Sequence, residues 1–182
     1  MPTLIVDANS GLVAPALQRR SPNQDLRPDA KDISLIVVHC ISLPPGSYGG
    51  GEIEAFFANK LDVAAHPYFK QIQSMQVSAH VLIDRQGGVT QFVPFHRRAW
   101  HAGASSYGGR EACNDYSIGI ELEGTDDSEF DPLQYASLNA LITALNTVYG
   151  AGESLPVVGH SDIAPGRKTD PGEKFDWSQL KP

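Results

Sequence analysis

Residues 33–40 read ISLIVVHC, and this stretch decides the fold. Almost every position is apolar, so both alternating faces of the segment are suited to burial. Such a run is typical of a strand that lies inside a sheet and is covered on both sides. The stretch closes with a histidine, and we therefore expect the carboxyl end of a buried strand to present His39.

Two further strands are expected downstream. Residues 117–123 read SIGIELE, in which apolar and polar positions alternate. The apolar positions would face the core, which turns Glu121 to the other face with the small Gly119 before it. A short strand at 155–159 ends at His160, so a second histidine is expected at a strand end.

Helices and a hairpin complete the expected framework. Residues 131–150 carry the clearest helical pattern, with an Asp-Pro-Leu-Gln start typical of a capped helix and a glycine that can end it. A shorter amphipathic helix is expected from 53 to 61. Strand-like runs at 78–84 and 89–93 flank a Gln-Gly-Gly turn, which predicts a hairpin.

The length predicts one compact domain, because 182 residues can bury a sizeable core without disulfides or repeats. Residues 10–32 show neither helical nor strand periodicity, and residues 161–174 are punctuated by Pro and Gly. We expect 1–32 to be an irregular N-terminal arm that belongs to the same domain as 33–182, and 161–174 to be a loop.

Composition and charge exclude several classes of protein. The net charge is −7 with no basic block, which argues against a nucleic-acid partner. No apolar run approaches the roughly 20 residues of a membrane-spanning helix, and no positively charged signal region opens the chain. We therefore expect a cytoplasmic protein without a membrane partner, whose Cys40 and Cys113 are reduced thiols rather than a disulfide.

Three residues have side chains of the types that form a catalytic metal site. The chain has no HExxH, GxSxG, GxxxxGK[ST] or GxGxxG motif, so the commonest catalytic and phosphate-binding signatures are absent. His39, His160 and Asp170 would supply the three ligands that catalytic zinc prefers, with a fourth position open. Each of them could instead be an ordinary hydrogen-bonded surface or core residue.

Two further residues are candidates for acid–base and electrostatic roles. Glu121 could act as a general base that returns its proton to a leaving amine, or it could be an ordinary outward-facing carboxylate. Lys168 lies two residues before Asp170 and could stabilise an oxyanion, although a solvated lysine is the simpler interpretation.

The segment from 100 to 110 offers candidate substrate contacts. Trp100, His101 and Gly103 could grip a sugar or an amide edge, or the histidine could be a buried structural residue. Tyr107 and Arg110 could belong to a binding rim, but a loop of this composition needs no function.

Six segments in order resemble the zinc N-acetylmuramoyl-L-alanine amidases, which are related to phage lysozyme-amidases and peptidoglycan recognition proteins. They are VVHCISLPPG, HPYF, VSAHVLIDRQG, RAWHAG, NDYSIGIELEGTD and GHSDIAPGRKTDPG, and the resemblance runs from about residue 21 to residue 177. It is strongest to the cytosolic members that act on anhydro-muramyl peptides. Ala79 stands where phage and animal relatives have a catalytic tyrosine, and Gln76 where many close relatives have an arginine.

The resemblance implies an α/β fold, with a central mixed sheet flanked by helices, a zinc cleft at one side of the sheet, and 33–182 as the catalytic domain. It implies that His39, His160 and Asp170 bind Zn²⁺, that Glu121 is the acid–base residue and that Lys168 stabilises the oxyanion. The expected substrate is a small soluble muropeptide and the expected state is a monomer.

Two alternatives stay open at this stage. The chain could be a non-catalytic peptidoglycan-binding module, although the complete set of candidate metal ligands speaks against it. It could also be an envelope amidase that acts on intact peptidoglycan.

Overall fold

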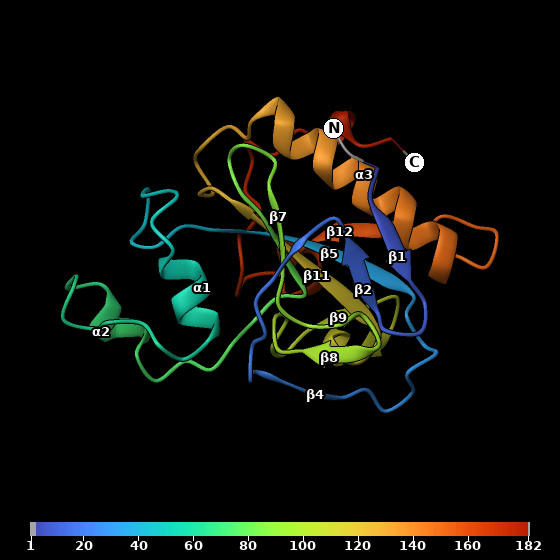
Figure 1. The fold of residues 1–182 in the computed structure, drawn as a ribbon, viewed down its shortest axis with the longest axis horizontal. Coiled ribbons are helices and arrows are strands. Elements are labelled where there is room, and N and C mark those ends of the chain that lie inside the picture. The colour runs from blue at the N-terminus through green and yellow to red at the C-terminus, as the bar shows by residue number, and fades with distance from the viewer. Residues whose placement is uncertain (1–2, 182) are drawn as a thin grey trace.

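The computed structural model describes residues 3–181, which fold around a six-stranded sheet (Figure 1). The strand order is β12-β5-β11-β6-β7-β3. Strands β5, β6, β11 and β12 run parallel, whereas β7 is antiparallel to β6, so the sheet is mixed. The strands are β3 (Leu17–Gln18), β5 (Leu35–Ile41), β6 (Val81–Ile83), β7 (Val89–Gln91), β11 (Ser117–Glu123) and β12 (Val157–Gly159). The predicted strands and hairpin are confirmed.

The two central strands carry the site and the main core on opposite faces. Strands β5 and β11 are paired in register over seven residues, with His39 opposite Glu121. Side chains alternate between the faces of a strand, and Ile118, Ile120 and Leu122 all belong to the main core. Glu121 therefore points away from the main core, as the alternation predicts.

Helix α3 (Pro132–Tyr149) covers the main-core face of the sheet. It begins with a capping box, in which the Asp131 carboxylate accepts a hydrogen bond from the Leu133 amide and the Gln134 side chain accepts one from the Asp131 amide. Gly150 caps its end. The predicted helix is confirmed at both ends, because local capping chemistry set them.

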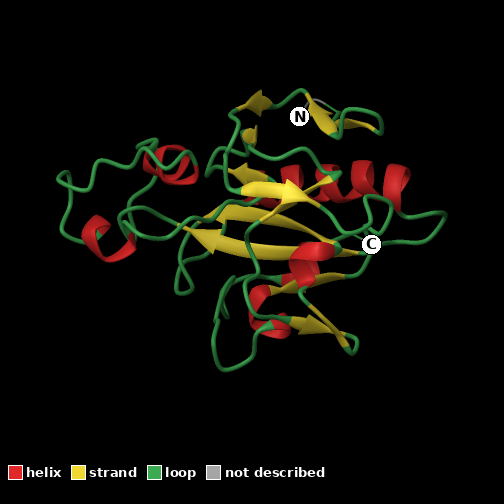
Figure 2. Ribbon diagram, turned by 90° about the horizontal axis from the view of Figure 1, so that it is seen from below, coloured by secondary structure: helices red, strands yellow, loops and turns green. Residues whose placement is uncertain are grey.

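Two short helices stand at one end of the sheet, away from α3 (Figure 2). They are α1 (Glu52–Phe57) and α2 (Phe69–Ile72). The prediction of one helix from 53 to 61 was too long, because the chain turns at Asn59, whose backbone is left-handed with φ 58°. Phe57 and Phe69 bury their rings in a second apolar cluster beneath this region.

The N-terminal arm is more regular than predicted. It contains the hairpin β1 (Ile5–Asp7) and β2 (Leu12–Ala14), the edge strand β3, and β4 (Gln24–Leu26), which pairs with β8 (Arg97–Ala99). Strands of two or three residues are too short to show a periodicity. Arg27 is buried and donates hydrogen bonds to the carbonyls of Asn114, Asp115 and Ser117, which fastens the arm to the main sheet.

The remaining elements are small and lie near the other face of the sheet or at the C-terminus. They are β9 (Ser106–Tyr107), β10 (Arg110–Glu111), η1 (Cys113–Asp115), α4 (His160–Ile163) and η2 (Trp177–Gln179). Helix α4 replaces the start of the loop predicted at 161–174. Within residues 3–181, no helix is both long and apolar enough to cross a membrane.

Candidate metal centre

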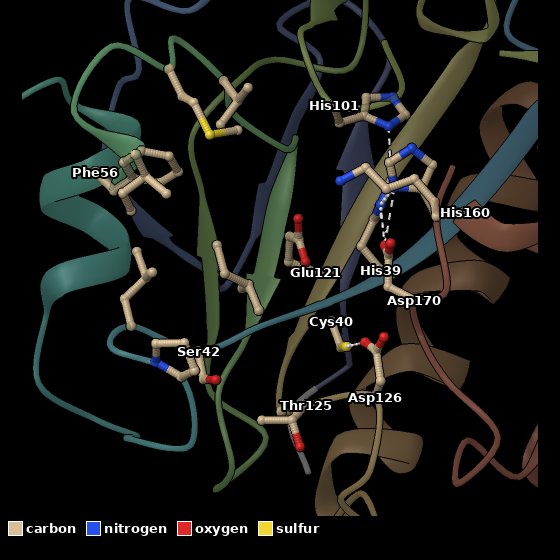
Figure 3. A pocket seen from close by; sticks show the side chains of 18 of the residues that line it. His39, Cys40, Ser42, Phe56, His101, Glu121, Thr125, Asp126, His160 and Asp170 are labelled. Atoms are coloured by element: carbon tan, nitrogen blue, oxygen red, sulfur yellow. Dashed lines mark hydrogen bonds and ion pairs between the residues drawn. The ribbon is translucent and has the colours of Figure 1, made fainter. Parts of the chain in front are cut away.

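The side chains of His39, His160 and Asp170 meet at one end of the sheet (Figure 3). His39 lies near the carboxyl end of β5, and His160 directly follows the neighbouring parallel strand β12. The carboxyl ends of adjacent parallel strands bring the two rings together. Asp170 reaches them from the following loop, which is fixed by a 3.0 Å hydrogen bond from the Ser161 amide to the Asp170 carbonyl.

Three candidate ligand atoms converge within this cluster. Nδ1 of His39 lies 2.9 Å from Nδ1 of His160 and 3.0 Å from Oδ2 of Asp170. The His160 Nδ1 to Asp170 Oδ2 distance is 3.1 Å. Two imidazole nitrogens and one carboxylate oxygen in mutual contact are the donor set of a three-ligand metal site. The cluster could therefore hold a metal ion.

The ionisation of the cluster suits a cation. Burial lowers the pKa of His39, against the opposing effect of Asp170. Burial by itself would raise the pKa of Asp170, but its hydrogen bonds with His160 and His39 outweigh burial and hold that pKa below its usual range. The ring of His160 donates from Nε2 to the Ala102 carbonyl at 3.1 Å, which leaves the lone pair of its Nδ1 directed into the cluster. A neutral His39 ring beside the ionised carboxylate of Asp170 leaves negative charge in the cluster, which attracts a cation.

Glu121 stands beside the cluster on β11. Its Oε2 is buried and has no hydrogen-bond partner among the described residues. Burial and the nearby charge of Asp170 raise the pKa of Glu121 well above its ordinary value, and Lys168 partly offsets them. An unpartnered carboxylate oxygen with a raised pKa is suited to accepting a proton from a bound molecule.

A cavity of about 460 Å³ opens over these residues. Its polar wall contains the metal cluster, Glu121 and Lys168, which sequence reasoning predicted. Its opposite wall is apolar and was not predicted, because the residues come from three separate segments whose meeting no local pattern reveals. The apolar wall includes Leu43, Phe56, Phe57, Tyr68, Ile72, Met75 and Val77.

The predicted substrate contacts divide into two groups. Trp100 and His101 line the cavity. Gly103 instead packs beside the Arg167 guanidinium, and Tyr107 lies in β9 against a separate apolar cluster. Arg110 forms an ion pair with Asp32 and lies over the Tyr116 ring, 3.8 Å from its centroid. The structure does not bring the last three predicted residues into the cavity.

Asp126 is a cavity residue that the sequence did not single out. Its carboxylate accepts hydrogen bonds from the Thr169 hydroxyl and, at 3.2 Å, from the Cys40 thiol. It thereby ties the loop after β11 to the loop that carries Lys168 and Asp170. Both cysteines are free, as predicted, and burial raises the pKa of the Cys40 thiol above its ordinary range.

The sequence of the chain is similar to those of known proteins. Residues 29–173 match the model of a family described as N-acetylmuramoyl-L-alanine amidase. The chain is 50% identical over 175 residues to the 1,6-anhydro-N-acetylmuramyl-L-alanine amidase AmpD of Haemophilus influenzae, across 96% of this chain and 95% of that protein.

Two solved structures extend the comparison. The chain resembles the crystal structure of a selenomethionine derivative of AmpD with a TM-score of 0.92, at 53% identity over 97% of each chain. It resembles the amidase AmiD from E. coli, in complex with anhydro-N-acetylmuramic acid-L-Ala-D-gamma-Glu-L-Lys, with a TM-score of 0.58 at 28% identity, over 98% of this chain and 64% of that one. The predicted fold class, a mixed sheet flanked by helices, is confirmed.

Proposed function

The chain belongs to the N-acetylmuramoyl-L-alanine amidase family, and we propose how its residues cleave the bond between 1,6-anhydro-N-acetylmuramic acid and L-alanine. It is an amidase of cell-wall recycling, with AmpD relatives over nearly its whole length. The convergence of His39, His160 and Asp170 beside Glu121 in one cavity carries the mechanistic proposal.

His39, His160 and Asp170 hold a zinc ion in this proposal. The donor set fits zinc, because two neutral imidazoles and one carboxylate leave a fourth position open. When bound there, zinc supplies Lewis acidity for water and for the scissile carbonyl. The remaining steps belong to side chains of the cavity.

Glu121 moves the proton of the reaction. Its carboxylate takes a proton from the attacking water as the new C–O bond forms at the lactyl carbonyl. It then returns the proton to the alanine nitrogen as the C–N bond breaks, so that the products are a carboxylic acid and a free amine. The raised pKa of Glu121 makes its carboxylate a stronger base than that of an ordinary glutamate, which favours the first half of this transfer.

Lys168 stabilises the negative charge that develops on the carbonyl oxygen during attack. Its side chain shares the cavity with Glu121 and Asp170, and a fixed cation in a partly dehydrated site is effective at this task. The apolar wall opposite excludes water from the reacting bond and offers packing surface to the methyl groups of the lactyl and alanyl units.

We extend the proposal to the setting of the enzyme. It acts in the cytoplasm as a monomer on small soluble muropeptides, and residues 1–32 and 33–182 form one domain. The hydrogen bonds of the buried Arg27 to three carbonyls of 33–182 support the single domain. Light scattering of the purified protein tests the monomer, and turnover of soluble anhydro-muropeptides against whole sacculi tests the substrate class. Faster turnover of sacculi would favour the envelope role instead.

Metal content and turnover together test the proposed function. We expect about one zinc per chain and release of stem peptide from a purified anhydro-muramyl tripeptide. Asp170→Ala should lose both. Glu153→Ala, which removes an exposed carboxylate in the turn that follows α3, is the control that should keep both. Binding of the tripeptide without cleavage, or undiminished cleavage by chelator-treated protein, would overturn the mechanism.

A further inference from the structure

A chain of hydrogen bonds leads from His39 along one face of the sheet to a backbone carbonyl in η1, just before β11 begins. Ser117 Oγ lies 2.6 Å from the Cys113 carbonyl oxygen, and 3.2 Å from Nε2 of His101. Nδ1 of His101 lies 2.9 Å from Nε2 of His39 (Figure 3). The proton on each link can be assigned by starting from the carbonyl, because a carbonyl oxygen can only accept.

The assignment proceeds link by link toward the metal cluster. Ser117 has one hydroxyl proton, and donating it to the Cys113 carbonyl leaves only lone pairs for His101. Nε2 of His101 must therefore carry a proton. A neutral ring has only one, so Nδ1 of His101 is an acceptor, and Nε2 of His39 donates to it.

The consequence falls on the opposite nitrogen of His39. With its proton on Nε2, the neutral ring has a bare Nδ1, which is the atom that faces His160 and Asp170. We propose that His101 and Ser117 are positioning residues that hold His39 in its metal-binding tautomer and orientation. The proposal rests on the proposed function, since it concerns the same metal site, and it assigns His101 a role other than gripping substrate.

The two histidine ligands are thus held in different ways. His160 donates directly to a carbonyl, that of Ala102. His39 is connected to the Cys113 carbonyl only through the side chains of His101 and Ser117. Ligand orientation by an outer hydrogen bond is a general feature of metal-binding histidines, and its loss costs about 10–100-fold in metal affinity or activity.

Gly119 provides the room that the His101 ring needs. A Cβ built on this glycine would lie 2.4 Å from Cγ and 2.5 Å from Nδ1 of His101, well inside van der Waals contact. Its place in the middle of strand β11 is therefore explained by the packed imidazole. Ser117 and Gly119 lie on the same face of this strand, one holding the ring and the other making space for it.

Zinc affinity, measured by chelator competition, separates a positioning residue from a substrate contact. His101→Leu should weaken zinc binding by about 10–100-fold and alter the visible absorption of the Co²⁺-substituted protein. Activity should return with excess zinc, at an unchanged KM. His101→Asn should retain most of the affinity, because its Oδ1 can occupy the place of the accepting Nδ1. Ser117→Ala should weaken zinc binding in the same direction and by less, since it removes only the last link.

His80 offers the matched control. It is also a buried histidine, 5.7 Å from His101 between ring centroids, but it hydrogen-bonds to Gly119 and Arg97 rather than to a metal ligand. His80→Leu should lower the melting temperature and leave zinc affinity unchanged.

The proposal is overturned if His101→Leu binds zinc as tightly as the wild type, or if its only defect is a raised KM. It is also overturned if His80→Leu loses zinc to the same extent, because core damage would then account for the effect. Each of these outcomes leaves zinc binding and cleavage by the wild-type protein intact. Failure of the proposed function would abolish those, so the two failures are distinguishable.

Discussion

The substitution Gly119→Ala should damage the metal site without altering any residue that contacts the metal or the substrate. The added methyl group would meet His101 at 2.4 Å, and ordinary van der Waals contact between such atoms begins near 3.4 Å. The ring must therefore retreat by about 1 Å. The hydrogen bond between His39 and His101, 2.9 Å long in the native chain, would stretch beyond the range of a hydrogen bond.

The expected size of the effect has two parts. Overpacking a well-filled core costs about 1–3 kcal/mol of folding stability. Loss of the outer hydrogen bond of a ligating histidine costs about 10–100-fold in metal affinity, which is about 1.4–2.7 kcal/mol of binding free energy. The first should appear in the unfolding of the metal-free protein, and the second only when metal is present.

A double-mutant cycle with His101→Ala isolates the contact between the methyl group and the ring. Chemical denaturation of the metal-free proteins gives the stability terms, and chelator competition gives zinc affinity. In the His101→Ala background the ring is gone, so Gly119→Ala should cost little further stability and no further zinc affinity. Additive losses in the double mutant would refute the reasoning, since they would place the damage in the strand rather than in the ring.

Three further perturbations test other parts of the structure. Glu121→Gln should stabilise the metal-free protein increasingly as pH rises above 4.5, the ordinary pKa of a glutamate. The pKa of Glu121 is raised in the folded state, so the wild type loses about 1.4 kcal/mol of stability per pH unit until Glu121 ionises. Melting temperatures of both proteins from pH 4 to 9 measure this, and parallel curves would contradict it. Lys168→Met should lower kcat by about 10²–10³-fold and leave the zinc content near the wild-type value. Turnover and metal content are measured on the same preparation, and a change confined to KM would exclude the oxyanion role. Asp131→Ala should lower the free energy of unfolding by about 1 kcal/mol, because the α3 cap is lost, while zinc affinity and kcat stay constant. A loss of zinc-binding free energy as large as the loss of stability would mean that α3 and the site are coupled.

The elements that could be predicted from the sequence are those whose signals are local. The run at 33–40, the alternation at 117–123 and the capped helix at 131–150 each contain their own periodicity, and all three are confirmed. The positions of His39 and His160 at strand ends followed from the same patterns. Their meeting in space required the parallel pairing of β5 with β12, for which the resemblance to a known family was needed.

The outer parts of the site could not be predicted in this way. The chain of hydrogen bonds joins His101 to Ser117, 16 positions away, and to His39, 62 positions away. It ends at a backbone carbonyl, which has no sequence signature. His101 was predicted as a possible sugar contact or a structural histidine, and only the hydrogen bonds of both ring nitrogens distinguish a third role. The structural role of Arg27 could not be predicted either, because arginine is seldom buried and its partners are backbone carbonyls.

The folding of β11 and the geometry of the site impose the same register. One face of this strand packs three large aliphatic side chains into the main core, and the other presents Ser117, Gly119 and Glu121 in succession. A slip of one residue would exchange the faces, which would bury the carboxylate under α3 and turn the aliphatic groups toward His101. That exchange is disfavoured, because it places a charged group in the main core and bulky side chains where only Gly119 fits. The core therefore holds Glu121 opposite His39 and Gly119 beneath His101, so that the precision of the site derives from residues that never touch the substrate.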